Sequence, residues 1–205
     1  MQFSLNKKFL LAISVVFLSS CESMPEKYNS VCELMDNKIS WYKSLEKVEK
    51  NRGIDKSTIL AFIKQESSFN AYAKTPIKKV FFDLIPVGRD SSSYGFSQAK
   101  DVTWKWYQQK TGNFSADRDD FYDSSDFIAW YILQSKKMVN ISTNDVYNQY
   151  LAYHEGQGGF KNGSYNSKPW LKKVAKKVAK TAKSYKSNLK ACEKNLDNIY
   201  SWSYF

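Results

Sequence analysis

The sequence predicts a mainly α-helical protein with one hydrophobic core, and three observations support this fold class. Apolar residues recur every three or four positions in several separate segments, which is the spacing of amphipathic helices. Alternating strand patterns are scarce, and no internal repeat is evident. The length of 205 residues is enough for a single domain with a real core and gives no sign of a second one.

The amino terminus has the pattern of an export signal. Residues 1–20 contain Lys7 and Lys8, then an apolar run over residues 9–18, then two serines. The run is too short to span a membrane comfortably, which favours a cleaved signal peptide over a transmembrane helix. The serines precede Cys21, and this order resembles the bacterial lipobox, in which the cysteine becomes the lipidated first residue of the mature protein. The alternative is an ordinary cleaved signal followed by a chance cysteine.

Lipidation of Cys21 predicts a lipoprotein that is tethered to a membrane by its amino terminus. Acyl chains contribute about 0.8 kcal/mol per buried CH₂, so several chains on one residue give a stable anchor. Residues 21–35 include Pro25 and are expected to form a polar tether. By analogy with the sorting of Gram-negative lipoproteins, Glu22 in place of Asp after the cysteine predicts the outer membrane, facing the periplasm.

The basic charge of the chain indicates an anionic partner. The formal net charge is +11, and loss of Lys7 and Lys8 with the signal peptide lowers it by two, to about +9. Exported proteins rarely meet nucleic acid, so we expect anionic cell wall, lipid head groups or lipopolysaccharide to be attracted instead. We expect a monomer.

Two helices are predicted in the first part of the domain. Residues 36–50 carry apolar side chains at intervals of three, and Arg52 and Gly53 end this helix. Asp55 is a plausible N-cap for the next helix, over residues 56–67.

The segment after these helices is expected to be a long loop insertion. Residues 75–93 contain two prolines, a glycine and a serine triplet around a short apolar piece, which predicts irregular structure with room for a hairpin. Long loops in compact domains are often functional.

Further helices are predicted over residues 99–109, over residues 125–138, and from Thr143 to the glycines that begin at Gly156. A final helix over residues 171–185 has an apolar stripe on one side and lysines on the other. Such a basic amphipathic helix lies on a membrane in some proteins. The other interpretation is a helix packed on the core with its lysines in solvent, and the thin apolar face of valine and alanine favours it.

The cysteines near the two ends of the domain are expected to form a disulfide. If Cys21 is lipidated, Cys32 and Cys192 remain as a pair in an oxidising compartment. The bridge would close a very long loop and contribute about 4 to 5 kcal/mol in the chain-entropy model, or less if it is strained. Two free thiols are the alternative. We place the domain at residues 36–192 and a carboxy-terminal tail at residues 193–205.

A carboxylic acid occupies a position in the second helix where an apolar residue is expected. Ile59, Phe62, Ile63 and Glu66 fall at positions i, i+3, i+4 and i+7 of one helical face. Burial of a carboxylate against apolar side chains raises its pKa and keeps it protonated near neutral pH. A protonated glutamic acid can serve as the general acid in glycoside cleavage. The alternative is a glutamate at the helix end that is turned to solvent.

Three stretches together resemble the lysozyme-like soluble lytic transglycosylase family, and they occur in the order that the family has. They are Glu66-Ser67 followed by Phe69-Asn70, Tyr94-Gly95-Phe96-Ser97-Gln98, and Ala152-Tyr153-His154-Glu155-Gly156. The resemblance covers roughly residues 55–185 and implies a lysozyme-like transglycosylase domain with a long loop insertion. It implies a lyase that acts on peptidoglycan glycan strands in the cell wall, with no cofactor.

The resemblance also implies roles for particular residues. Glu66 matches the one catalytic carboxylate, which first protonates the glycosidic oxygen and then accepts the proton of the muramyl C6 hydroxyl, giving a 1,6-anhydro end. Ser67 matches the serine beside this acid, where its hydroxyl can orient the substrate or the glutamate. Gln98 matches the glutamine that hydrogen-bonds substrate, and Tyr153 matches the tyrosine close to the acid, so a bond from Tyr153 to Glu66 is expected. A helix-capping Gln98 and a core Tyr153 are the structural alternatives.

Tyr94 and Glu155 complete the expected substrate-binding set. The sequence departs from the family at Phe96-Ser97, where Leu-Met is more common, and at His154-Glu155, where Asn and a small residue are usual. The second departure predicts an extra carboxylate near the cleft.

Other chemistries are less compatible with the sequence. A zinc protease motif needs a second histidine, and the chain has only one, so we expect no metal site. A lysozyme-type muramidase on the same fold would need a second carboxylate, for which Asp83, Asp90 and Glu155 are candidates. A non-catalytic lipoprotein that binds peptidoglycan is the remaining alternative.

Overall fold

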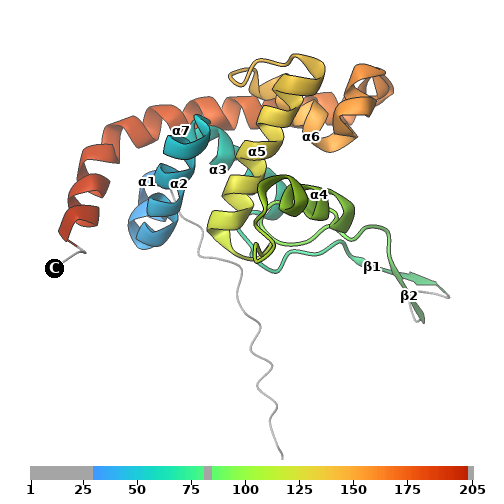
Figure 1. The fold of residues 1–205 in the computed structure, drawn as a ribbon, viewed down its shortest axis with the longest axis horizontal. Helices are drawn as coiled ribbons and strands as arrows, with labels where there is room; N and C mark the ends of the chain where they lie inside the picture. Colours follow the sequence, from blue (N-terminus) through green and yellow to red (C-terminus); the bar gives the residue numbers. More distant parts are fainter. Residues whose placement is uncertain (1–29, 81–84, 203–205) are drawn as a thin grey trace, which may run out of the picture.

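The computed structural model describes residues 30–80 and 85–202, and helices dominate it (Figure 1), which confirms the predicted fold class. The expectations for the signal peptide and for lipidation at Cys21 lie outside the described residues, as does Asp83. The elements are α1 (Val31–Asn37), α2 (Ile39–Arg52), α3 (Lys56–Ser67), β1 (Ile77–Val80), β2 (Ile85–Arg89), α4 (Asp101–Thr111), α5 (Phe121–Val139), α6 (Val146–Lys161), the short 3₁₀ helix η1 (Ser164–Ser167) and α7 (Pro169–Trp202).

Helix α3 has the bounds that the sequence predicts and lies in the interior of the fold. Its side chains are buried from Lys56 to Ile63, and it packs against α7 and α5. The carboxylate of Asp55 accepts a hydrogen bond from the backbone N–H of Ser57, as expected of an N-cap. A helix that is buried on most sides holds its last turn in a fixed position, and Glu66 belongs to that turn.

The packed domain extends beyond both of its expected boundaries. Helix α1 occupies residues 31–37, and its buried side chains Leu34 and Met35 belong to the core instead of a polar tether. Helix α7 continues past residue 192 to Trp202, and its Leu196 is buried. These segments are short, so their few apolar positions form no long periodic pattern in the sequence.

A disulfide between Cys32 and Cys192 joins α1 to α7, which confirms the predicted pairing. The two cysteines are separated by 160 positions in the sequence. The bridge therefore ties the first described helix to the last one.

Helix α7 runs along one side of the molecule for most of its length (Figure 1). Its apolar stripe packs against α3 and α6, whereas lysines on its other sides are exposed, which agrees with the interpretation of a helix packed on the core. The buried residues of the stripe are Leu171, Ala175, Val178, Ala182, Leu189 and Leu196. None of the helices in the described part of the chain combines the length and apolar character needed to cross a bilayer.

The long loop contains a β-hairpin, in agreement with the room for a hairpin that the sequence indicated. Strands β1 and β2 are antiparallel, with Ile77 opposite Arg89 and Val80 opposite Ile85. The hairpin projects away from the helices (Figure 1). The segments that flank it, near Thr75 and Ser93, return to the helical body beside the end of α3.

Helix α6 does not end at its glycines, contrary to the prediction. Gly156 has φ 75° and ψ 159°, a conformation that is nearly restricted to glycine, and the helix resumes after this kink and continues to Lys161. The residue after the kink, Gln157, still contacts α5, because it accepts a hydrogen bond from the Tyr131 hydroxyl at 3.2 Å and donates one to the Ser135 hydroxyl at 3.3 Å. The kink lies at the edge of the site described next.

Candidate active site

A cleft of about 480 Å³ opens between the end of α3, the segments that flank the hairpin, and helices α4, α5 and α6. Glu66, Gln98 and Tyr153 all line this cleft, although they come from three distant stretches of the sequence. The structure therefore brings the three predicted motifs together. The lining residues are Glu66, Thr75, Ser91, Ser93, Gln98, Ala99, Lys100, Thr103, Phe127, Tyr131, Tyr153, His154, Glu155 and Gly156.

Glu66 faces the cleft from the last turn of α3, and its helical neighbours Phe62 and Ile63 are fully buried. Its Oε1 accepts a hydrogen bond from the hydroxyl of Tyr150 at 2.8 Å, and no other hydrogen bond to this carboxyl occurs among the described residues. Burial raises the pKa of Glu66 from 4.5 to about 7, against the opposing effect of the Tyr150 hydrogen bond. A carboxyl with this pKa is partly protonated at neutral pH.

The tyrosine that contacts Glu66 is Tyr150, and the expectation of a bond from Tyr153 is wrong. The Tyr153 hydroxyl donates instead to the backbone carbonyl of Ser97 at 2.7 Å. The two tyrosines are three residues apart on α6, and both rings meet the ring of Phe62 edge-on. A spacing of three places both side chains on one face of the helix, which is the signal that could have identified Tyr150.

Gln98 lines the cleft with its amide held in one orientation. Its Nε2 donates to the carbonyl of Ala73 at 2.8 Å and to that of Gly95 at 2.9 Å. Gly95 has φ 76°, and a Cβ at this position would lie 2.0 Å from the carbonyl oxygen of Arg118, so only glycine fits. Because both hydrogen bonds use the amide nitrogen, the amide oxygen remains as an acceptor.

Ser67 and Tyr94 do not line the cleft. The Ser67 hydroxyl donates to the carbonyl of Ile63 in its own helix at 3.1 Å. The Tyr94 hydroxyl donates to Asp119 at 2.8 Å. Tyr94 also pairs through its backbone with Lys74 and Ala99, so it holds together the segments on either side of the hairpin.

Glu155 lines the cleft, as predicted, but it is already paired. Both of its oxygens accept hydrogen bonds from Lys168, at 2.8 and 3.0 Å, and it also contacts the Ser164 hydroxyl and the His154 ring. Burial alone would raise the pKa of Glu155, but the charge and hydrogen bonds of Lys168, Ser164 and His154 lower it to about 2. Sequence reasoning missed Lys168, because this contact crosses η1 and follows no helical spacing.

Of the other candidates for a second carboxylate, Asp90 belongs to the described part of the chain. Asp90 is exposed after β2 and does not line the cleft. Asp83 belongs to residues 81–84, which lie outside the described residues. Glu66 and Glu155 are thus the two carboxylates among the lining residues.

A helical domain with a glutamic acid of raised pKa in a polar cleft, at the end of a buried helix, is typical of the lysozyme-like class of glycan-cleaving domains. The chain matches the family model of the transglycosylase SLT domain over residues 9–192, and it belongs to this family. Membership indicates an enzyme that acts on peptidoglycan. A comparison with curated proteins gives no match.

Proposed function

We propose that this chain is a lytic transglycosylase that cleaves the MurNAc–GlcNAc β-1,4 bond of peptidoglycan, with Glu66 as its one catalytic carboxylate. The observation that carries the proposal is the environment of Glu66. Its carboxyl opens onto a cleft of about 480 Å³ and has one neutral hydrogen-bond donor, and burial raises its pKa to about 7. A general acid works best when its pKa lies near the operating pH.

The proposed reaction uses Glu66 twice. Its proton passes to the glycosidic oxygen while the bond from that oxygen to C1 of MurNAc breaks, and the GlcNAc side leaves as an alcohol. The resulting carboxylate then accepts the proton of the C6 hydroxyl of MurNAc, whose oxygen forms a bond to C1. The product is a 1,6-anhydro end, no water is consumed, and Glu66 regains its proton.

Two neighbouring residues support the geometry of this reaction. The hydroxyl of Tyr150 holds Glu66 Oε1, which restricts the direction of the carboxyl. The fixed amide of Gln98 presents an oxygen that can accept a hydrogen bond from an N–H or O–H group of a bound sugar.

The state of Glu155 supports intramolecular attack over hydrolysis. A lysozyme-type muramidase would need a second carboxylate to activate water or to hold a glycosyl intermediate. Glu155 is the available residue in the cleft, but it is bound to Lys168 and has a pKa of about 2. A carboxylate with so low a pKa is a weak base, so it is poorly suited to activate water.

The test is mass spectrometry of the muropeptides that the purified mature protein releases from sacculi. We expect 1,6-anhydro ends, whereas reducing ends would replace the proposed reaction by hydrolysis. Glu66→Gln should abolish release and leave sedimentation with sacculi unchanged. If the wild-type protein binds sacculi and releases nothing, the chain is a binding protein and the catalytic proposal is wrong.

We also propose that Cys21 carries a lipid that anchors the enzyme to the outer membrane, facing the periplasm. The support is the order of charge, apolar run and cysteine in residues 1–21, together with Glu22 at the next position. Cys21→Ser should move the protein from the membrane fraction to the soluble periplasmic fraction and prevent incorporation of labelled palmitate. Density-gradient separation of the wild-type membranes would identify which membrane holds the protein.

A further inference from the structure

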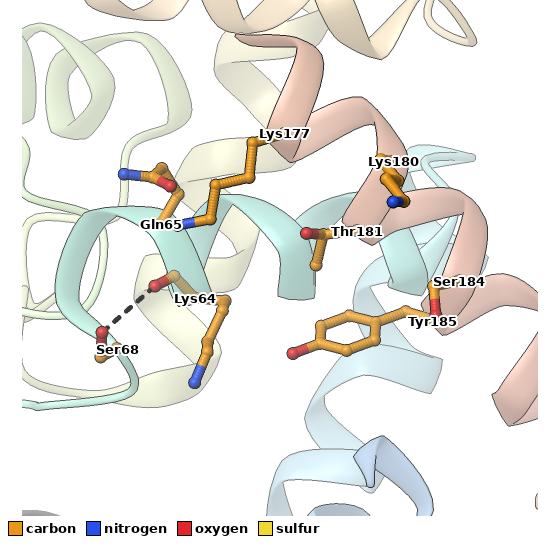
Figure 2. Close-up of a pocket in the computed structure, with 8 residues that line it drawn as sticks. All are labelled: Lys64, Gln65, Ser68, Lys177, Lys180, Thr181, Ser184 and Tyr185. Carbon is orange, nitrogen blue, oxygen red and sulfur yellow. Dashed lines mark hydrogen bonds between the residues drawn. The ribbon is translucent and has the colours of Figure 1, made fainter. Parts of the chain in front are cut away.

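A second pocket of about 460 Å³ lies between the carboxyl-terminal half of α3 and helix α7 (Figure 2). None of its lining residues also lines the cleft of Glu66. They are Lys64, Gln65 and Ser68 of the α3 end, and Lys177, Lys180, Thr181, Ser184 and Tyr185 of α7.

The pocket and the cleft lie on different sides of α3. Lys64 and Ser68 are four positions apart, so they share one side of the helix end. Glu66 is two positions from Lys64, which turns its side chain by about 200° around the helix axis. A molecule in the pocket would therefore not touch the carboxyl that we propose as the catalytic acid.

The pocket is positively charged, and no acidic side chain among its lining residues balances that charge. Three lysines line it, and no aspartate or glutamate does. Two lysines near the pocket have carboxylate partners: Lys186 pairs with Asp55 at 2.6 Å, and Lys56 pairs with Glu193 at 2.7 Å. Among the residues that the structure describes, no ion pair involves the three pocket lysines, and the Lys64 ammonium lies 5.6 Å from the centre of the Phe69 ring.

Neutral hydrogen-bonding groups surround these charges. Figure 2 shows the side chains of Thr181 and Tyr185 extending from α7 toward α3, and Gln65 also lines the pocket. The Ser68 hydroxyl stays at the rim, where it bonds weakly to the Lys64 carbonyl at 3.4 Å. Hydroxyl, amide and ammonium groups together suit a ligand with several acceptor oxygens and more than one negative charge.

We propose that this pocket binds a phosphate group. A phosphate monoester carries about 1.5 to 2 negative charges at neutral pH, so it balances three ammonium groups better than a carboxylate with one charge does. Lysine binds phosphate as a point charge, without the two-pronged geometry that arginine imposes. The phosphate monoester can come from a soluble ester or from the head group of a membrane lipid such as phosphatidic acid, and the experiment below separates the two sources. Because the pocket does not open onto the cleft, its occupant would position the enzyme and would not take part in bond cleavage.

The test uses the mature chain from Cys21 with that cysteine replaced by serine, and the probe is glycerol 3-phosphate. Binding is measured by calorimetry at low salt for the parent and for two double variants. Lys177→Gln with Lys180→Gln removes two pocket charges and should weaken binding by about tenfold or more. Lys176→Gln with Lys194→Gln removes two exposed charges of α7 outside the pocket and should change binding by about twofold at most.

The source of the phosphate is tested with vesicles. Sedimentation with vesicles that contain phosphatidic acid, but not with vesicles of phosphatidylcholine alone, would assign the site to a lipid head group if it is lost only in the pocket variant. Binding of glycerol 3-phosphate without vesicle binding would assign it to a soluble ester. Each result supports a phosphate site.

Three results would overturn the proposal. If both double variants weakened binding equally, the overall positive charge of α7 would attract the probe, and the pocket would not be a specific site. Succinate binding as tight as that of glycerol 3-phosphate would mean that the pocket does not select phosphate. No binding to either probe by the parent protein would mean that there is no site. All variants should retain their circular dichroism spectrum and their release of muropeptides, so failure here is distinguishable from failure of the proposed enzymatic function.

Discussion

The two glutamates that line the cleft have pKa values shifted in opposite directions, although burial acts on both. Glu66 receives one hydrogen bond, from the neutral hydroxyl of Tyr150, and burial raises its pKa to about 7. The Glu155 side chain is only 4% exposed, yet its pKa is lowered to about 2 because Lys168, Ser164 and His154 offset the effect of burial. The difference teaches that burial alone does not decide whether a carboxyl is charged. A cation within hydrogen-bond distance decides it.

The two environments also suit different tasks. A buried carboxyl with no cation beside it keeps a proton that it can donate, but its burial lowers the folding stability. A carboxylate that is paired with a cation has no proton to donate at neutral pH. It instead links α6 to the residues that follow η1. One end of the cleft is therefore arranged for proton transfer, and the other end for holding the kinked part of α6 in place.

The largest expected difference between the two residues is in activity. Glu66→Gln should lower the rate of muropeptide release by about 10²- to 10⁴-fold, because the general acid is lost. Glu155→Gln is the matched change in the same cleft, and it should lower the rate by about tenfold at most, since it removes no proposed proton donor. The measurement is the initial rate on purified sacculi at pH 6. Similar losses of rate in the two variants would mean that Glu66 and Glu155 do not have different roles in the reaction.

The next effect is on the pH dependence of stability. The carboxyl of Glu66 titrates at 4.5 in its ordinary state and at about 7 in the folded protein. The folded state therefore binds more protons between these values, and stability falls as the pH rises from about 4.5 to about 7. The full cost is about 3 kcal/mol above pH 7.

Glu66→Gln removes this cost, because glutamine does not titrate. In urea unfolding, the stability of the variant relative to the wild type should increase by about 3 kcal/mol between pH 4.5 and pH 8. A difference that stays constant over this range would mean that Glu66 is ionised at little cost, contrary to the proposed role.

A smaller effect is expected from the partner of Glu155. Lys168→Met leaves the carboxylate without its cation and should lower stability at pH 7 by about 1 to 3 kcal/mol, a range reduced because the Lys168 side chain is 38% exposed. The folded pKa of Glu155 lies below its ordinary value, so its stabilisation is present above about pH 4.5 and is lost as the pH falls toward 2. The deficit of the variant should therefore shrink in acid.

Lys172→Met is the control for this change. Lys172 lies on the same helix and hydrogen-bonds to the neutral Asn166 at 2.9 Å. Its replacement should have little effect on stability at any pH. An equal loss in both variants would show that the Lys168 effect is not due to charge compensation.

The smallest effect concerns the tyrosine that contacts Glu66. A single neutral hydrogen bond contributes about 0.5 to 1.5 kcal/mol, and the one from Tyr150 lowers the pKa of Glu66. Tyr150→Phe should therefore raise the pKa of Glu66 above its value in the wild type, as followed by the carboxyl ¹³C shift. Tyr153→Phe removes a hydroxyl that bonds to the Ser97 carbonyl and should leave the Glu66 titration in place. If Tyr153→Phe shifted the Glu66 titration and Tyr150→Phe did not, Tyr153 would be the partner of Glu66, as the sequence predicted.

Much of the fold and part of the candidate site could be predicted from sequence patterns. The bounds of α3 follow from its apolar spacing and from the N-cap at Asp55, and the same spacing indicates that Glu66 is desolvated. The pairing of Cys32 with Cys192 follows from elimination in an oxidising compartment. The ends of the domain could not be predicted in the same way, because α1 is too short to show a period.

The order of residues indicates which side chains face the core, since the periodicity of a helix is local. The resemblance of three stretches to one family predicted that Glu66, Gln98 and Tyr153 act together, and the structure brings them to one cleft. The partner of each polar group in the cleft depends on the tertiary structure: Tyr150 for Glu66, Lys168 for Glu155, and the Ser97 carbonyl for Tyr153. The physical reason is that a hydrogen bond depends on a few tenths of an ångström, and those distances are set by how whole elements pack, not by the sequence around either partner.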